Sequence, residues 1–202
     1  MRWIKTALMV FAASLLMGCG TLSSLSKAGK ELDAYTLSPA RGSGDPAGGS
    51  RHLIVELPSS PGALATDRIL FKPVPYQAQY LPEGRWSEPA PALMQTLLVA
   101  SFQNLGGFRL VGRTANGLNP DYTLMTEVQD FQAEPLGSDP PQFVVRIGMV
   151  MTLIRESDRQ VAASRRFTAT ETVGSDDTRT LVAAFDRAVQ GVLRDVVLWA
   201  AR

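Results

Sequence analysis

An apolar pattern of period two at residues 142–155 constrains the fold more than any other part of this sequence. Every second residue is apolar, and in a strand such residues share one face because successive side chains point to opposite sides. These positions are Phe143, Val145, Ile147, Met149, Met151 and Leu153. A polar turn follows at 156–159, and a strand pattern resumes at 160–172. The sequence therefore predicts an antiparallel hairpin of two long strands.

Two other segments show the 3.6-residue period of an amphipathic helix. The first runs from about 88–91 to 105, where Ser87 can cap its start and Gly106-Gly107 ends it. The second runs over 178–201, after the capping stretch Ser175-Asp176-Asp177. Strands are predicted at 52–57, 68–71, 108–112 and 122–131, the last with a bulge near Asp130. Residues 76–86 are predicted to be irregular.

This order of elements predicts the fold class. Two strands precede the first helix, and four strands lie between the two helices. Consecutive strands in this arrangement favour an α+β fold, a two-layer sandwich with a mainly antiparallel sheet and two helices packed on one face. A split β-α-β-β arrangement is the alternative.

The start of the chain is typical of a bacterial lipoprotein signal peptide. Arg2 and Lys5 precede an apolar stretch at 7–16 that is too short to span a membrane. Leu16-Met17-Gly18-Cys19 then places the only cysteine where a lipobox requires it. The sequence predicts residues 1–18 as a signal peptide and Cys19 as a lipid-modified N-terminus.

Residues 19–50 are predicted to be a lipidated tether and flexible linker, because 38–50 is rich in glycine, proline and serine. Within them, Tyr35-Thr36-Leu37 is predicted to form a short strand that docks on its own sheet or on a partner. The folded domain is predicted at 51–202. Gly20, in place of an aspartate after the cysteine, favours the periplasmic face of the outer membrane.

Composition excludes several classes of function. Without residues 1–18 the chain has 18 basic and 19 acidic residues, which is not the basic balance of a nucleic-acid-binding protein. His52 is the only histidine, and the anchor takes the only cysteine. The ligand sets that zinc prefers therefore cannot be assembled, and with His52 alone, at the start of a strand, a Ser-His-Asp site is not expected. We expect that the protein is not an enzyme and that it carries no cofactor beyond the lipid on Cys19.

Binding is the function that these exclusions leave. Tyrosine and tryptophan are enriched at interfaces, and an aromatic, proline-containing segment lies at 76–86. The candidate partner-binding residues are Tyr35, Leu37, Tyr76, Tyr80 and Trp86. The alternative is that the rings of 76–86 cover the core of their own domain.

Several loose features occur in a specific order along the chain. They are Cys19, Tyr35-Thr36-Leu37, Leu53 to Pro58, Leu64 to Ile69, Tyr76, Tyr80, Trp86, Asp121 to Leu124, and Phe131. In this order the sequence resembles the ABC-type transport auxiliary lipoproteins, the family that includes the lipoprotein of the paraquat-inducible Pqi system. No catalytic residue comes with the resemblance.

The resemblance implies a periplasmic accessory of a lipid-transporting ABC system. In such systems an inner-membrane ABC permease and its ATPase work with an MCE-domain protein that forms a hydrophobic conduit. The lipoprotein would dock this conduit to the outer membrane, and a homo-oligomeric ring is a further expectation. Two other hypotheses stay open: a lipid- or lipopolysaccharide-binding lipoprotein that holds its ligand between sheet and helices, and an envelope hydrolase.

Overall fold

The computed structural model describes residues 31–42, 49–115 and 119–202 of the 202-residue chain. A compact unit spans Asp33–Arg202, and a first unit, Met1–Leu32, has only its last two residues in the described ranges. Cys19 and the predicted signal peptide lie outside the described residues. Within the described ranges, no helix has the length and apolar character needed to cross a bilayer.

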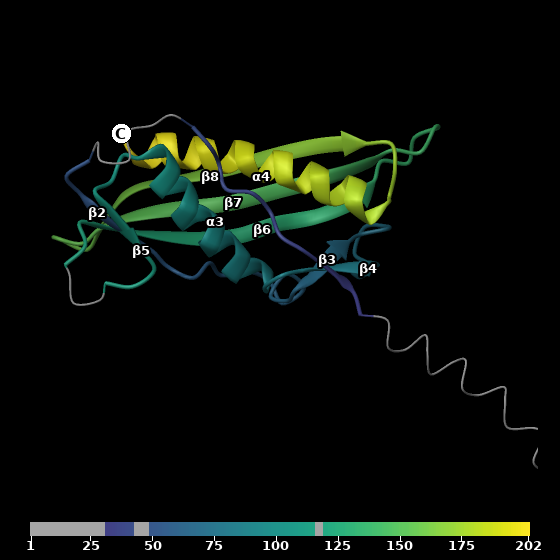
Figure 1. Cartoon of the computed structure of the whole chain (residues 1–202), viewed down its shortest axis with the longest axis horizontal. Helices are drawn as coiled ribbons and strands as arrows, with labels where there is room; N and C mark the ends of the chain where they lie inside the picture. The colour runs from purple at the N-terminus through teal and green to yellow at the C-terminus, as the bar shows by residue number, and fades with distance from the viewer. Residues whose placement is uncertain (1–30, 43–48, 116–118) are drawn as a thin grey trace, which may run out of the picture. The chain divides into compact units, whose positions relative to one another are not determined.

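Eight strands and two helices make up the described part of the Asp33–Arg202 unit (Figure 1). The strands are β1 (Asp33–Tyr35), β2 (His52–Val55), β3 (Arg68–Phe71), β4 (Gln79–Trp86), β5 (Leu110–Gly112), β6 (Tyr122–Pro135), β7 (Phe143–Arg155) and β8 (Gln160–Val173). The helices are α3 (Ala90–Leu105) and α4 (Thr178–Ala200). The predicted α+β class is confirmed.

The sheet is organised around β6. One edge of β6 pairs antiparallel with β7, which in turn pairs with β8. Two strands share its other edge: Leu53 of β2 lies opposite Tyr122, and Leu70 of β3 lies opposite Gln132. Ser59 bridges to the middle of β6 between them. Thus β2 with β5, and β3 with β4 and β1, form two separate branches at opposite ends of β6.

The sheet is mixed, so the prediction of a mainly antiparallel sheet is wrong. Four of the seven strand pairings are parallel, namely β1–β4, β2–β5, β2–β6 and β3–β6. The hairpin of β7 and β8 was predicted because alternation and a tight turn are local signals. Parallel strands pair through long crossover connections, and nothing local in the sequence reports which distant strand each one meets.

The segment predicted to be irregular contains β4. Its pairing with β3 shifts register between Leu70–Tyr80 and Arg68–Arg85. Pro82 lies within this shift, where it is not among the paired positions, so its missing N–H breaks no ladder there. The predicted bulge near Asp130 is confirmed by the register shift between Val128 and Asp130 in the β6–β7 pair.

Both helices have the predicted bounds to within about two residues. Asp177 caps α4 by accepting a hydrogen bond from the Thr180 amide at 3.0 Å, and this bond holds the pKa of Asp177 below its ordinary value. α3 instead begins after Pro89 with no side-chain cap. The Ala90 amide bonds to the Thr66 carbonyl at 3.0 Å, so the predicted Ser87 cap is absent from this helix.

The core lies between the sheet and the two helices (Figure 1). α4 packs over β7 and β8, and α3 packs against α4, β5 and β2. At the centre, the rings of Trp86, Phe131 and Phe185 contact one another with centroids 5.0–5.2 Å apart. One ring from β4, one from β6 and one from α4 therefore join the branch strands, the central strand and the helix layer.

The N-terminal segment docks on its own domain. β1 pairs parallel with β4, with Tyr35 opposite Trp86, and the Ser87 amide donates to the Tyr35 carbonyl at 2.7 Å. Residues 36–42, which we call the strap, then contact both helices. The Ser38 amide donates to Asp186 of α4 at 2.6 Å, and the Ala40 amide donates to Ser101 of α3 at 2.9 Å. The compact unit thus begins at Asp33, ahead of the predicted boundary at residue 51.

Candidate functional site

The five predicted partner-binding residues lie in different environments. Trp86 is only 1 % exposed and is surrounded by the aromatic core, so its predicted contact with a partner is wrong for the folded chain. Its ring covers the core, which was the alternative reading of this segment. Leu37 is buried in the strap, and Tyr35 is half-buried on β1.

Tyr80 and Tyr76 are the members of the set that face solvent. Tyr80 is 37 % exposed, and its hydroxyl donates to the Ala63 carbonyl at 3.2 Å. The guanidinium of Arg68 lies over its ring, 5.6 Å from the centroid. Tyr76 is fully exposed in the connection between β3 and β4. For these two residues partner binding stays a prediction.

Tyr76 belongs to a tight turn. The Gln77 amide donates to the Val74 carbonyl at 3.2 Å, which places Pro75 and Tyr76 at the two central positions. Tyr76 has φ 70°, in the left-handed region. Proline followed by a residue with positive φ is the type II pattern, in which the second residue is usually glycine. A bulky aromatic residue therefore occupies a position that backbone sterics reserve for glycine.

Two more apolar side chains lie beside this turn. Val74 is 53 % exposed, and Leu136, the residue after β6, is 44 % exposed. The residues next to them, Pro75 and Pro135, line the same open hollow. We call Val74, Tyr76 and Leu136 the apolar tip. Sequence reasoning missed Val74 and Leu136, although an apolar residue between prolines, and one before a turn glycine, are detectable signals.

One ionisable group beside the apolar tip has a perturbed pKa. Glu134 pairs with Arg146, with the two charged groups 2.8 Å apart, and it accepts a hydrogen bond from Gln132 at 3.0 Å. Partial burial acts to raise the pKa of Glu134, but these hydrogen bonds and the charges of Arg146 and Lys72 lower it further, below its ordinary value of 4.5. Glu134 is therefore ionised at neutral pH and engaged by its neighbours.

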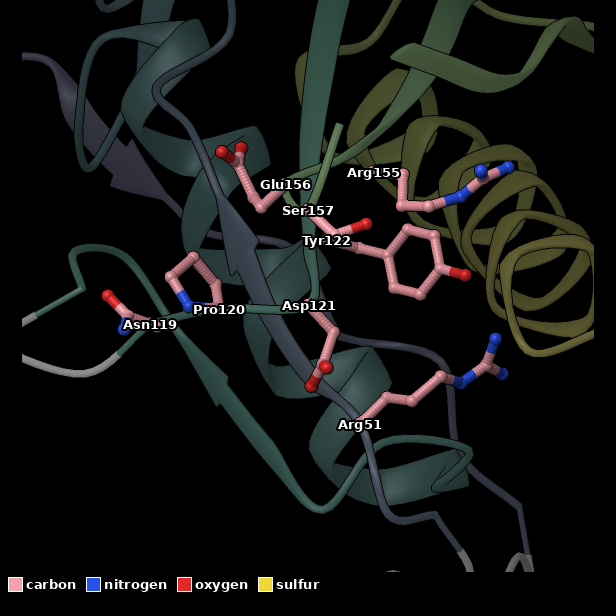
Figure 2. Close-up of a pocket in the computed structure, with 8 residues that line it drawn as sticks. All are labelled: Arg51, Asn119, Pro120, Asp121, Tyr122, Arg155, Glu156 and Ser157. Carbon is pink, nitrogen blue, oxygen red and sulfur yellow. The ribbon is translucent and has the colours of Figure 1, made fainter. Parts of the chain in front are cut away.

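A pocket of about 530 Å³ lies at the opposite end of the sheet (Figure 2). Its lining comes from the start of β6, the β7–β8 turn and the residue before β2: Arg51, Asn119, Pro120, Asp121, Tyr122, Arg155, Glu156 and Ser157. The Arg51 guanidinium lies 5.3 Å from the ring centroids of both Phe108 and Tyr122. It also donates to the Ala201 carbonyl at 3.2 Å. Arg51 therefore packs against the core and the end of α4.

The acidic groups of this pocket are already bonded. Asp121 accepts a hydrogen bond from the His52 amide at 2.6 Å, which ties β2 to β6. Glu156 accepts hydrogen bonds from Thr123 at 2.5 Å and from Arg159 at 3.0 Å. Both carboxylates thus join strands and turns. Elsewhere in the described ranges too, no three His, Cys, Asp or Glu side chains come together as a metal site.

Comparison with known proteins identifies the family. Residues 35–197 match the family described as the ABC-type transport auxiliary lipoprotein component. An uncharacterised protein of Bradyrhizobium diazoefficiens is 28% identical over 153 residues, which are 74% of this chain and 39% of that protein. The chain thus spans about two fifths of the length of this curated relative.

Solved structures show the same fold. A crystal structure of a Xanthomonas campestris protein has a TM-score of 0.73 and 27% sequence identity, covering 85% of this chain and 95% of that one. A crystal structure of another uncharacterised protein has a TM-score of 0.62 at 18% identity, covering 84% of this chain and 99% of that one, and shows the likeness of fold alone.

The family match extends from the last residue of β1 almost to the end of α4. It therefore includes the strap, the sheet, both helices and the apolar tip. The family's description links its members to ABC-type transport and names them lipoproteins. The chain belongs to the ABC-type transport auxiliary lipoprotein family.

Proposed function

We propose that this protein is a non-enzymatic lipoprotein of the outer membrane's periplasmic face, lipidated at Cys19, that docks the MCE-domain conduit of a lipid-transporting ABC system to that membrane. The observation that carries the proposal is the family match over residues 35–197. The lipobox cysteine that precedes the match supports the anchor. In this proposal residues 1–18 are the cleaved signal peptide.

The packing of the core favours docking over ligand carriage. A carrier that holds lipid between sheet and helices needs space in that layer. Here the centre of the layer is filled by Trp86, Phe131 and Phe185, and the Trp86 and Phe185 rings pack edge to face. An acyl chain could occupy this centre only by displacing these rings.

The bonding of the acidic groups also favours a non-enzymatic protein. A general base must be free to take a proton from a substrate. In the pocket of Figure 2, Asp121 and Glu156 accept hydrogen bonds from backbone and side-chain donors. These hydrogen bonds join β2, β6 and the β7–β8 turn. Their bonds support a structural role at this corner of the sheet.

Self-association is part of the proposal. β8 is a strand of 14 residues, and β7 is its only strand partner in the described ranges. Its outer edge offers backbone donors and acceptors to a strand of another chain. This edge supports the expectation of a homo-oligomeric ring.

The proposal is tested by capture of the full-length lipoprotein from its own envelope after mild crosslinking, with proteins and lipids both identified. We expect an MCE-domain protein and the ABC permease and ATPase in the eluate. The Cys19→Ser variant is the control, because it should lose the acyl chains and leave the outer-membrane fraction. Lipid without any transporter subunit would contradict docking and favour a carrier.

A further inference from the structure

The turn at the apolar tip holds a tyrosine at a position whose backbone conformation favours glycine. Tyr76 has φ 70° at the second central position of a turn whose first central residue is Pro75. Holding a non-glycine residue in this region costs free energy, and such a cost persists where the surroundings or the function require it. The Tyr76 side chain is fully exposed, so contacts within the domain do not account for it.

The three exposed side chains of the apolar tip come from two neighbouring connections, β3–β4 and β6–β7. Figure 1 shows both connections at one end of the unit, away from the β7–β8 turn. Exposed aromatic and aliphatic side chains gathered at one end of a domain suit the lipid–water interface, where tyrosine rings are enriched.

The chain enters the domain in the branch of the sheet that carries the β3–β4 connection. β1 begins at Asp33 opposite Gly84, toward the end of β4 that is farther from that connection. β3 joins this branch to β6 at Gln132 and Ala133. β6 ends three residues after Gln132, at Pro135, and begins ten residues before it, at Tyr122, or about 33 Å away at 3.3 Å per residue.

The length of the tether makes this position matter. Cys19 precedes Asp33 by 14 residues, which span at most about 50 Å in any conformation. An anchor at Cys19 therefore keeps the start of β1 within about 50 Å of the membrane. The tether joins the domain through the branch that carries the β3–β4 connection, so the apolar tip lies within its reach.

We propose that the apolar tip, Val74, Tyr76 and Leu136, inserts into the lipid–water interface of the membrane that anchors the chain. This inference rests on the proposed lipid anchor at Cys19. The tip then acts as a second, orienting contact, which directs the β7–β8 end of the domain away from the bilayer. Acyl chains alone limit how far the domain can move from the membrane. A second contact with the membrane also fixes the orientation in which the domain meets a partner.

The charges around the tip indicate an apolar mode of binding. Lys72 lines the same hollow, and the charge of Glu134 is paired with Arg146. A neighbouring hollow beside Tyr80 is lined by Glu83, Asp176 and Asp177. This balance is not a basic patch for anionic lipid, so binding should occur on zwitterionic phosphatidylcholine and should be insensitive to salt.

The test uses the full-length mature lipoprotein in vesicles of phosphatidylcholine, with tryptophan reporters and brominated phosphatidylcholine as quencher. Val74→Trp reports on the tip. Val161→Trp is the matched control, because Val161 is 59 % exposed beside the β7–β8 turn at the other end. The native Trp86 and Trp199, which pack against Phe131 and Phe167, give the same background in both variants.

We expect the brominated lipid to quench the Val74→Trp reporter at least twofold more than the Val161→Trp reporter, with no change at high salt. Adding Tyr76→Gly to Val74→Trp should reduce that quenching. Equal quenching of the two reporters would overturn the proposal. A second result would also overturn it. If lipid leaves the emission of the tip reporter unchanged but the MCE-domain protein shifts that emission to shorter wavelength, the tip binds protein.

The outcome separates this inference from the proposed function. Vesicle quenching requires only the lipoprotein and lipid, whereas capture from the envelope requires the transport system. Quenching at the tip without co-captured transporter subunits would refute docking and keep the membrane contact. Co-capture together with equal quenching of both reporters would refute the membrane contact and keep docking.

Discussion

Trp86 and Tyr76 lie ten residues apart in one aromatic segment, yet they end in opposite environments. Trp86 closes β4, which pairs with β1 and β3, and its ring enters the centre of the core. Tyr76 lies in the turn before β4, and its side chain is fully exposed to solvent. Both residues are aromatic and close in sequence. They differ in that Trp86 lies on a paired strand and Tyr76 lies in a turn.

This difference shows which aromatic residues serve the fold and which are available for binding. A ring on a paired strand is directed to one face by the pleat, and here that face is covered by α4. A ring in a turn between strands projects outward. Composition marks both as interface residues, so the distinction requires the position of β4, which the sequence did not reveal.

The largest expected effect is at Trp86. Trp86→Ala removes a ring that contacts Phe131 and Phe185, and the cavity should lower the free energy of unfolding by about 3–5 kcal/mol. Urea denaturation followed by circular dichroism measures this change. Tyr76→Ala is the matched control and should change stability by less than about 0.5 kcal/mol. Similar losses in both variants would remove the contrast between the two rings.

A smaller effect is expected where the strap meets α3. Ser101 is buried, and its hydroxyl accepts from the Ala40 amide and donates to the Leu97 carbonyl at 2.7 Å. Ser101→Ala leaves that amide without this acceptor and should cost about 1–3 kcal/mol. Limited proteolysis should then cut the strap earlier. Ser138→Ala, on an exposed turn, should change neither; equal cleavage in the two variants would mean that the strap is held by other contacts.

The fold was predictable where its signals are local. The hairpin of β7 and β8, both helices and the bulge near Asp130 follow from alternation, helical period and turn residues. The parallel pairing of β2 and β3 with β6 was not predictable, because register between distant strands leaves no local pattern. β4 was missed because Pro82 argues against a strand unless a register shift accommodates it.

The candidate site was predictable in part for the same reason. Tyr76 was identified from its residue type, but Val74 and Leu136 become its neighbours only through the pairing of β3 with the end of β6. Trp86 and Leu37 were grouped with it because sequence alone does not separate a buried ring or aliphatic side chain from an exposed one.

Beside the apolar tip, the ionised state of Glu134 should contribute to stability in a pH-dependent way. The pKa of Glu134 is lowered on folding, so the contribution is present above its ordinary value of 4.5 and is lost as pH falls through the lower folded value. Glu134→Gln should cost about 0.2–1 kcal/mol at pH 7 and nothing measurable in strong acid. Thermal unfolding from strong acid to pH 7 measures this, with the exposed Glu83→Gln as control. A difference that persists unchanged in strong acid would assign the effect to shape rather than charge.

The smallest expected effect has the opposite sign to that at Trp86, and it sharpens the comparison most. Tyr76→Gly relieves a positive φ of 70°, a gain that is partly offset because glycine gives the unfolded chain more freedom. Unfolding in urea should show a stability between unchanged and about 1 kcal/mol higher. Together with the reduced quenching expected in vesicles, this result would show a residue kept at the expense of stability. A clear loss of stability in Tyr76→Gly would instead mean that the ring supports the turn, and the two aromatic residues would then differ in degree rather than in kind.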